Sequence, residues 1–189
     1  NGLVVNQVDY GSMAYVLSTP TKRSAIVITQ AIYMIVTPFL MIATVCASRI
    51  LSNYLIYDDA DATNTMMLYL GMYILIEAIA GICYMSSCIF NYSRKATAFG
   101  GGLTVWFFLA SLLGMFGTEE LVNMGVGVEE LGVFNKMTLM GLYDTNAIQT
   151  FVTDDVDYAF VWKLIVLAII AVVTYIIGAV RFEKKDLPL

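Results

Sequence analysis

Histidine is missing from this chain, and charge of either sign is scarce. The 189 residues contain no His, the side chain that most often ligates metals and acts as a general base near neutral pH. A histidine-ligated metal site and a histidine-activated nucleophile are therefore both excluded. Charged residues make up 13% of the chain, about half the share found in soluble domains. A soluble globular domain is therefore not expected.

Cysteines are few, and nucleotide-binding motifs are absent. Cys46, Cys83 and Cys88 all lie inside apolar runs, which is typical of small buried residues rather than of disulfides or metal ligands. There is no G-x-x-x-x-G-K-[ST] motif. The run Gly100–Gly102 has no lysine after it, so we interpret it as a site of close helix packing or a flexible entry. We expect no catalytic residues, metal or cofactor in this chain, and no nucleic-acid partner.

Long apolar runs dominate instead. Hydrophobic residues make up 59% of the chain, and the mean hydropathy is +0.77. Four runs are long enough to cross a bilayer, at residues 24–48, 66–90, 96–117 and 159–180. The sequence therefore predicts an all-α integral membrane protein. We expect a polytopic bundle of four complete transmembrane helices, forming a single transmembrane domain over 1–189 and multi-pass in the lipid bilayer.

The distribution of charge predicts the orientation. Seven of the ten basic residues fall on one side of the four runs: Lys22, Arg23, Arg94, Lys95, Arg181, Lys184 and Lys185. The acids of the intervening segments fall on the other side: Asp58, Asp59, Asp61, Glu119, Glu120, Glu129, Glu130, Asp144, Asp154, Asp155 and Asp157. Because cytoplasmic loops are enriched in Lys and Arg, the basic side is predicted to be cytoplasmic and 181–189 to be a cytoplasmic tail.

The outer segment 119–140 carries apolar residues at roughly helical spacing, with acids between them. These are Leu121, Met124, Val128, Leu131 and Phe134. We expect one or two short helices that lie at the outer interface or dip partway into the membrane. An alternative is an acidic vestibule that gathers a cationic peptide.

The cytoplasmic loop 9–23 is too polar to cross a bilayer, yet it carries a group of apolar side chains. Met13, Tyr15, Val16 and Leu17 precede Pro20, which ends any helix that begins near Ser12. A short amphipathic helix held at the membrane face in this way is suited to receiving force from a soluble partner. Residues 1–10, which overlap the start of this loop, are expected to be the cytoplasmic tail of an earlier span.

Glu77 is the ionisable residue that lies deep inside a predicted span. Its helical face carries small and polar residues, including Ala80 and Gly81, which would allow another helix to approach with a hydrogen-bond donor. The expected donor is Thr29, Thr37, Thr44 or a tyrosine. Glu77 is then either a structural, hydrogen-bonded or protonated carboxyl, or part of a substrate pathway or proton-coupled step.

Three segments carry a resemblance to a known family. Asn6–Ser24 resembles the cytoplasmic loop of type-2 ABC transporter permeases, in which a Gly, a Met or Thr and an apolar pair precede Ser/Thr-Pro-x-x-Arg. The tail Arg181–Leu189 resembles the Phe-x-Lys/Arg-Lys/Arg-Asp-Leu-Pro ending of many bacterial members. Met137–Asp144 is similar to the outer segment of the family. The chain would correspond to the last four of six spans.

The resemblance implies a permease subunit in a bacterial plasma membrane, more commonly an exporter. A separate ATP-binding subunit would hold ATP and Mg, and a second permease copy or homologue would complete the pathway. Met13, Tyr15, Val16, Leu17 and Pro20 would dock that ATPase and couple its closure to transport. Two other classes stay open: a non-transporting immunity or sensor protein, and a proton-coupled secondary transporter that uses Glu77.

Overall fold

The fold consists of long helices that come together at one end of the bundle, which the basic residues predict to be cytoplasmic. The computed structural model describes residues 2–11, 23–57, 62–149 and 159–185. Within these ranges the chain is helical and forms no strand. Four helical segments are long and apolar enough to cross a membrane: Ser24–Ile56, Ala62–Ile89, Ser93–Met115 and Phe160–Glu183. The prediction of an all-α, four-span membrane protein is confirmed.

The first span is longer than the hydropathy pattern predicted. Helix α3 covers Arg23–Tyr57 and continues through Pro38 and past Arg49, where the predicted span had already ended. A charged side chain near the bilayer surface does not break a helix, because its head can remain in water while the backbone stays hydrogen-bonded. Hydropathy therefore located the apolar part of α3 but not the end of the helix.

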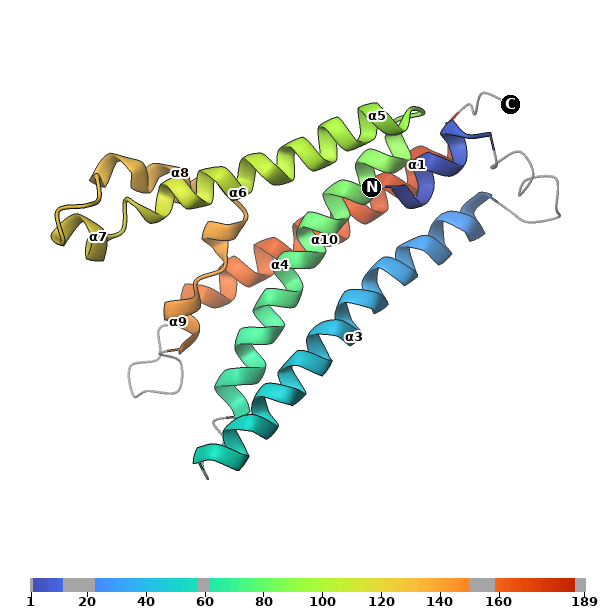
Figure 1. The fold of residues 1–189 in the computed structure, drawn as a ribbon. Coiled ribbons are helices and arrows are strands. Elements are labelled where there is room, and N and C mark those ends of the chain that lie inside the picture. The colour runs from blue at the N-terminus through green and yellow to red at the C-terminus, as the bar shows by residue number, and fades with distance from the viewer. Residues whose placement is uncertain (1, 12–22, 58–61, 150–158, 186–189) are drawn as a thin grey trace.

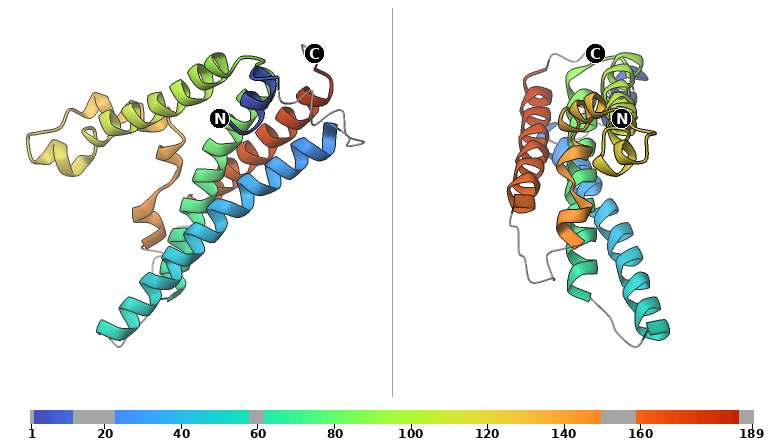
Figure 2. Two further views of the ribbon diagram at one scale, coloured as in Figure 1. Left: turned by 45° about the vertical axis from the view of Figure 1, so that its right-hand side comes forward. Right: turned by 90° about the vertical axis from the view of Figure 1, so that its left-hand side faces the viewer.

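The second and last spans follow their predictions closely. Helix α4 covers Ala62–Ile89 and helix α10 covers Ala159–Glu183. Helix α4 contacts both α10 and α3, and it lies between them in the right-hand view of Figure 2. Buried residues of α4 and α10, Leu75, Ala78, Leu167 and Ala171, form one hydrophobic cluster together with Leu139 of the outer segment. Helix α4 is therefore the central helix of the bundle.

The third span contains a π-helical turn where the glycine run lies. It begins as α5 (Ser93–Ala96), passes through the π-helical turn Thr97–Gly101 and continues as α6 (Gly102–Met115). Gly100 is buried where this turn contacts α4. The Ser86 hydroxyl of α4 donates a 2.7 Å hydrogen bond to the carbonyl of Ala96 just before the turn. Gly100 thus lies at a helix contact, whereas a Cβ atom at Gly102 would meet nothing within 4 Å.

The outer segment folds into short helices, and its part 119–140 contains two short α-helices, as predicted. These are α7 (Glu119–Asn123), a 3-10 turn at Glu129–Leu131, α8 (Gly132–Lys136), a 3-10 turn at Met140–Leu142 and α9 (Thr145–Gln149). Figure 1 shows this segment running from the end of α6 back towards α4 and α10. Its first part is open to the surroundings, since Met124 is 72% exposed.

The later part of this outer segment inserts between the spans. Leu139 and Ile148 are buried. The Tyr143 hydroxyl donates a 2.9 Å hydrogen bond to the carbonyl of Leu68 in α4, and its ring covers Gly71. A Cβ atom at Gly71 would lie 2.8 Å from that ring, so the absence of a side chain allows the contact. This part of the segment is therefore held against α4. The position of the helices in 119–140 relative to the membrane stays a prediction.

Single cysteines placed at the start of the third span and in the outer segment that follows it test the orientation. With Cys46, Cys83 and Cys88 replaced by alanine, Arg94→Cys and Met124→Cys each introduce one exposed thiol. In intact cells, an impermeant thiol reagent should label Met124→Cys fully and Arg94→Cys only after permeabilisation, because basic loops remain cytoplasmic. Labelling of both variants from outside would contradict the four-span orientation.

Candidate functional site

The residues predicted to matter for function lie in two places. Met13, Tyr15, Val16, Leu17 and Pro20 fall in 12–22, which is outside the described residues. The structure does describe the two helices that flank this loop, and it describes Glu77 completely.

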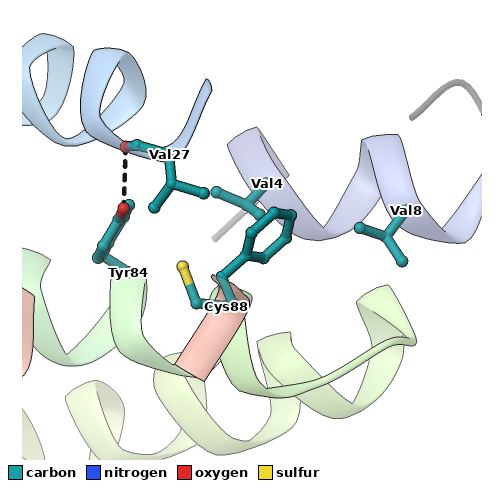
Figure 3. Close-up of a cluster of buried hydrophobic side chains, with 6 residues drawn as sticks. Val4, Val8, Val27, Tyr84 and Cys88 are labelled. Atoms are coloured by element: carbon teal, nitrogen blue, oxygen red, sulfur yellow. Dashed lines mark hydrogen bonds between the residues drawn. The ribbon is translucent and has the colours of Figure 1, made fainter. Parts of the chain in front are cut away.

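Both flanks of the loop 9–23 enter the same hydrophobic cluster, which we call the cytoplasmic cluster after the side that the basic residues predict. It consists of Val4, Val8, Val27, Tyr84, Cys88 and Phe182. Val4 and Val8 come from α1 (Gly2–Asp9), which precedes the loop, and Val27 comes from the first turns of α3, which follows it. The other members belong to α4 and α10 (Figure 3). One cluster thus joins both flanks of the loop to the two central helices.

Hydrogen bonds fix the geometry of this cytoplasmic cluster. The Tyr84 hydroxyl donates to the Val27 carbonyl at 2.9 Å, which links α4 to α3 (Figure 3). The backbone N–H of Ser93 donates to the Asp9 carboxylate at 3.0 Å, and the Ser93 hydroxyl donates to the Asn6 side chain at 2.7 Å. Residues 2–9 form helix α1, which packs against α4 and α5. That they are the tail of an earlier span stays a prediction.

The tail motif also has a structural role here. Phe182 is fully buried in the cytoplasmic cluster. The Lys185 ammonium donates hydrogen bonds to the carbonyls of Cys88 and Phe90, at 3.1 and 2.7 Å, where α4 ends. A cation at a helix C-terminus satisfies carbonyls that have no partner within the helix. Burial lowers the pKa of Lys185 to about 8. The sequence pattern of the tail indicated that these residues matter, but it did not predict what they contact.

Glu77 is buried at the contact between α4 and α10. Its side chain is 6% exposed, and Oε2 accepts a 3.0 Å hydrogen bond from the Tyr175 hydroxyl of α10. Of the donors considered from sequence, a tyrosine is the one that reaches it. The hydroxyls of Thr29 and Thr44 donate to carbonyls of their own helix. The sequence alone did not predict that Tyr175 is the partner, because nothing else in the sequence of its span indicates a contact with Glu77.

The second oxygen of Glu77 has no hydrogen-bond partner among the described residues. Oε1 is buried and unsatisfied, and no Lys or Arg side chain of the described chain forms an ion pair with this carboxyl. An isolated carboxylate is costly inside a membrane unless it is paired or neutral. Chemically, the arrangement is suited to holding a proton on Glu77. Within the described ranges, no group of three or more Cys, Asp and Glu residues could hold a metal ion.

Comparisons with known proteins do not assign a family. No protein-family model, no curated protein and no solved structure matches the chain. The resemblance of the loop and tail to ABC-2 permeases therefore stays a prediction from those motifs.

A double-mutant cycle tests whether Glu77 is structural. Tyr175→Phe should lower the stability of the otherwise unchanged protein by about 1–3 kcal/mol, since it leaves a second carboxyl oxygen unsatisfied. The same change should cost much less in a Glu77→Leu background, where no carboxyl remains. Thermal unfolding in detergent measures both. Additive effects would show that the two side chains are not coupled.

Glu77→Gln separates the structural role from proton transfer. The amide keeps the size and hydrogen-bonding capacity of the carboxyl, so the variant should fold and function normally. A Glu77→Gln protein with normal yield and thermal stability but no transport would contradict the structural interpretation and favour proton coupling.

Proposed function

We propose that this chain is the membrane-spanning permease subunit of an ATP-driven transporter of the ABC-2 type in a bacterial plasma membrane, acting in export. The observation that carries the proposal is the cytoplasmic cluster. It joins both flanks of the loop 9–23 to the cytoplasmic ends of α4 and α10. A loop whose flanks share one buried cluster with the central helices is well placed to transmit force to them.

In this proposal the energy comes from a separate ATP-binding subunit, which holds ATP and Mg. Closure of that subunit pushes on Met13–Pro20, and the push reaches α1 and α3 together. The hydrogen bonds from Tyr84 to Val27 and from Ser93 to Asp9 then pass it to α4 and to α5. A second permease copy or homologue supplies the other wall of the pathway, whose access alternates as the helices move.

A second candidate function has one observation in its favour. The buried Glu77, with one unsatisfied oxygen and a tyrosine partner on a neighbouring helix, is the kind of site that a proton-coupled secondary transporter uses. The Glu77→Gln test above distinguishes it. An immunity or sensor protein would bind a partner at the same cytoplasmic loop without transport, and the next experiment separates that class.

Charge placed in the coupling loop tests the docking. Tyr15→Asp with Leu17→Asp should weaken assembly with the ATPase by on the order of 2 kcal/mol, about thirtyfold, because such interfaces depend on a few buried apolar anchors. The measurement is the amount of ATPase that co-purifies with the tagged chain, together with transport per ATP hydrolysed. Tyr92→Asp, at an exposed position on the same membrane face, is the matched control and should leave both unchanged.

Two outcomes would count against the proposal. Unchanged assembly and unchanged coupling in the double variant would show that the loop is only a surface turn. Assembly with a stoichiometric partner that has no ATPase activity would favour the immunity or sensor class.

A further inference from the structure

The outer ends of α6 and α10 enclose a cavity that the proposed coupling does not use. Its volume is about 700 Å³, and the 3-10 turn at Met140–Leu142 lines it together with the two spans. Leu112 and Met115 contribute from the last turn of α6, and Trp162 contributes from the first turn of α10. The cavity therefore lies at the outer membrane boundary, as the orientation derived above requires.

Charged groups in the cavity are mainly basic. Lys163 lines it and forms a 2.9 Å ion pair with Asp144, which also lines it. Lys136, at the end of α8, lines the cavity and forms no ion pair with any side chain that the structure describes. Among the lining residues that the structure describes, two ammonium groups and one carboxylate give a net positive charge of one. This is notable on a side whose loops otherwise carry mostly acids.

The apolar wall of the cavity is open to the surroundings. Leu112, Met115 and Trp162 are 44%, 59% and 53% exposed, and all three lie in terminal turns of spans. Tryptophan is enriched at the level of lipid headgroups, where an apolar ring meets a wet, polar layer. A molecule that enters from the outer leaflet would thus find acyl-chain contacts beside a positive group.

We propose that this cavity binds the headgroup of an anionic phospholipid of the outer leaflet. The phosphate lies against Lys136 and Lys163, and an acyl chain packs along Leu112, Met115 and Trp162. The polar cavity selects the charge of the headgroup, while the open apolar wall gives the lipid lateral access. This inference does not depend on the transporter proposal, since the site lies at the opposite end of the bundle from the coupling loop.

Fluorescence quenching by brominated lipids tests the site directly. The chain has two tryptophans, so Trp106→Phe in the full-length protein leaves Trp162 as the reporter inside the cavity. The protein is reconstituted in phosphatidylcholine vesicles that contain a rising fraction of brominated phosphatidylglycerol or brominated phosphatidylcholine. Half-maximal quenching should require about fivefold less of the anionic lipid, the preference expected from one basic residue near a membrane surface.

Matched variants show whether Lys136 causes the preference. Lys136→Gln should abolish it and Lys136→Arg should retain it, with thermal unfolding unchanged in both. Lys184→Gln removes an exposed cation at the cytoplasmic end and should have no effect. Equal quenching by the two lipids, or a full preference in Lys136→Gln, would overturn the proposal. Loss of the preference on adding inorganic phosphate at constant ionic strength would overturn the lipid assignment and indicate a site for free phosphate.

Discussion

Helices α4 and α10 meet closely because glycine leaves space on each of them. A Cβ atom at Gly81 of α4 would lie 2.3 Å from the Thr174 hydroxyl oxygen of α10, and one at Gly178 of α10 would lie 3.0 Å from the Tyr84 ring of α4. Within lipid there is no hydrophobic force to bring two apolar helices together, so close packing and interhelical hydrogen bonds must hold them. The contact between α4 and α10 is therefore the constraint on which the rest of the bundle depends.

Each proposed site lies along this contact or at one of its ends. Midway, the approach of the two helices brings the Tyr175 hydroxyl within 3.0 Å of Glu77. At the end predicted to be cytoplasmic, Phe182 and Lys185 attach the end of α10 to α4, beside the flanks of the loop 9–23. At the outer end, Leu139 packs into the cluster shared by both helices, next to the turn that lines the proposed lipid site. A shift of α4 against α10 would therefore move residues at all three places.

Hydropathy and charge were sufficient to predict the four spans and a candidate intramembrane residue. Such patterns depend on the free energy of transferring each residue into lipid, which is a property of local sequence. They did not predict that α3 would continue to Tyr57, that residues 2–9 would pack as a helix, or that Tyr175 would be the partner of Glu77. Those features depend on which helix faces meet. The sequence of a mostly apolar span says little about how the helix is rotated around its axis, and so about which face meets a neighbour. The glycines of α4 indicated a face suited to helix packing, but they did not indicate which helix packs there.

The most direct test of this account compares two Gly→Ala substitutions by thermal unfolding in detergent. Gly102 lies on an exposed part of α6, and a Cβ atom there meets nothing within 4 Å. Gly102→Ala should therefore leave stability unchanged or raise it by up to about 1 kcal/mol, through helix propensity. Gly81→Ala should destabilise the protein, and Thr174→Ala should restore much of the loss by removing the hydroxyl that the new methyl group meets. Equal stability of the two alanine variants would contradict the central role of the contact between α4 and α10.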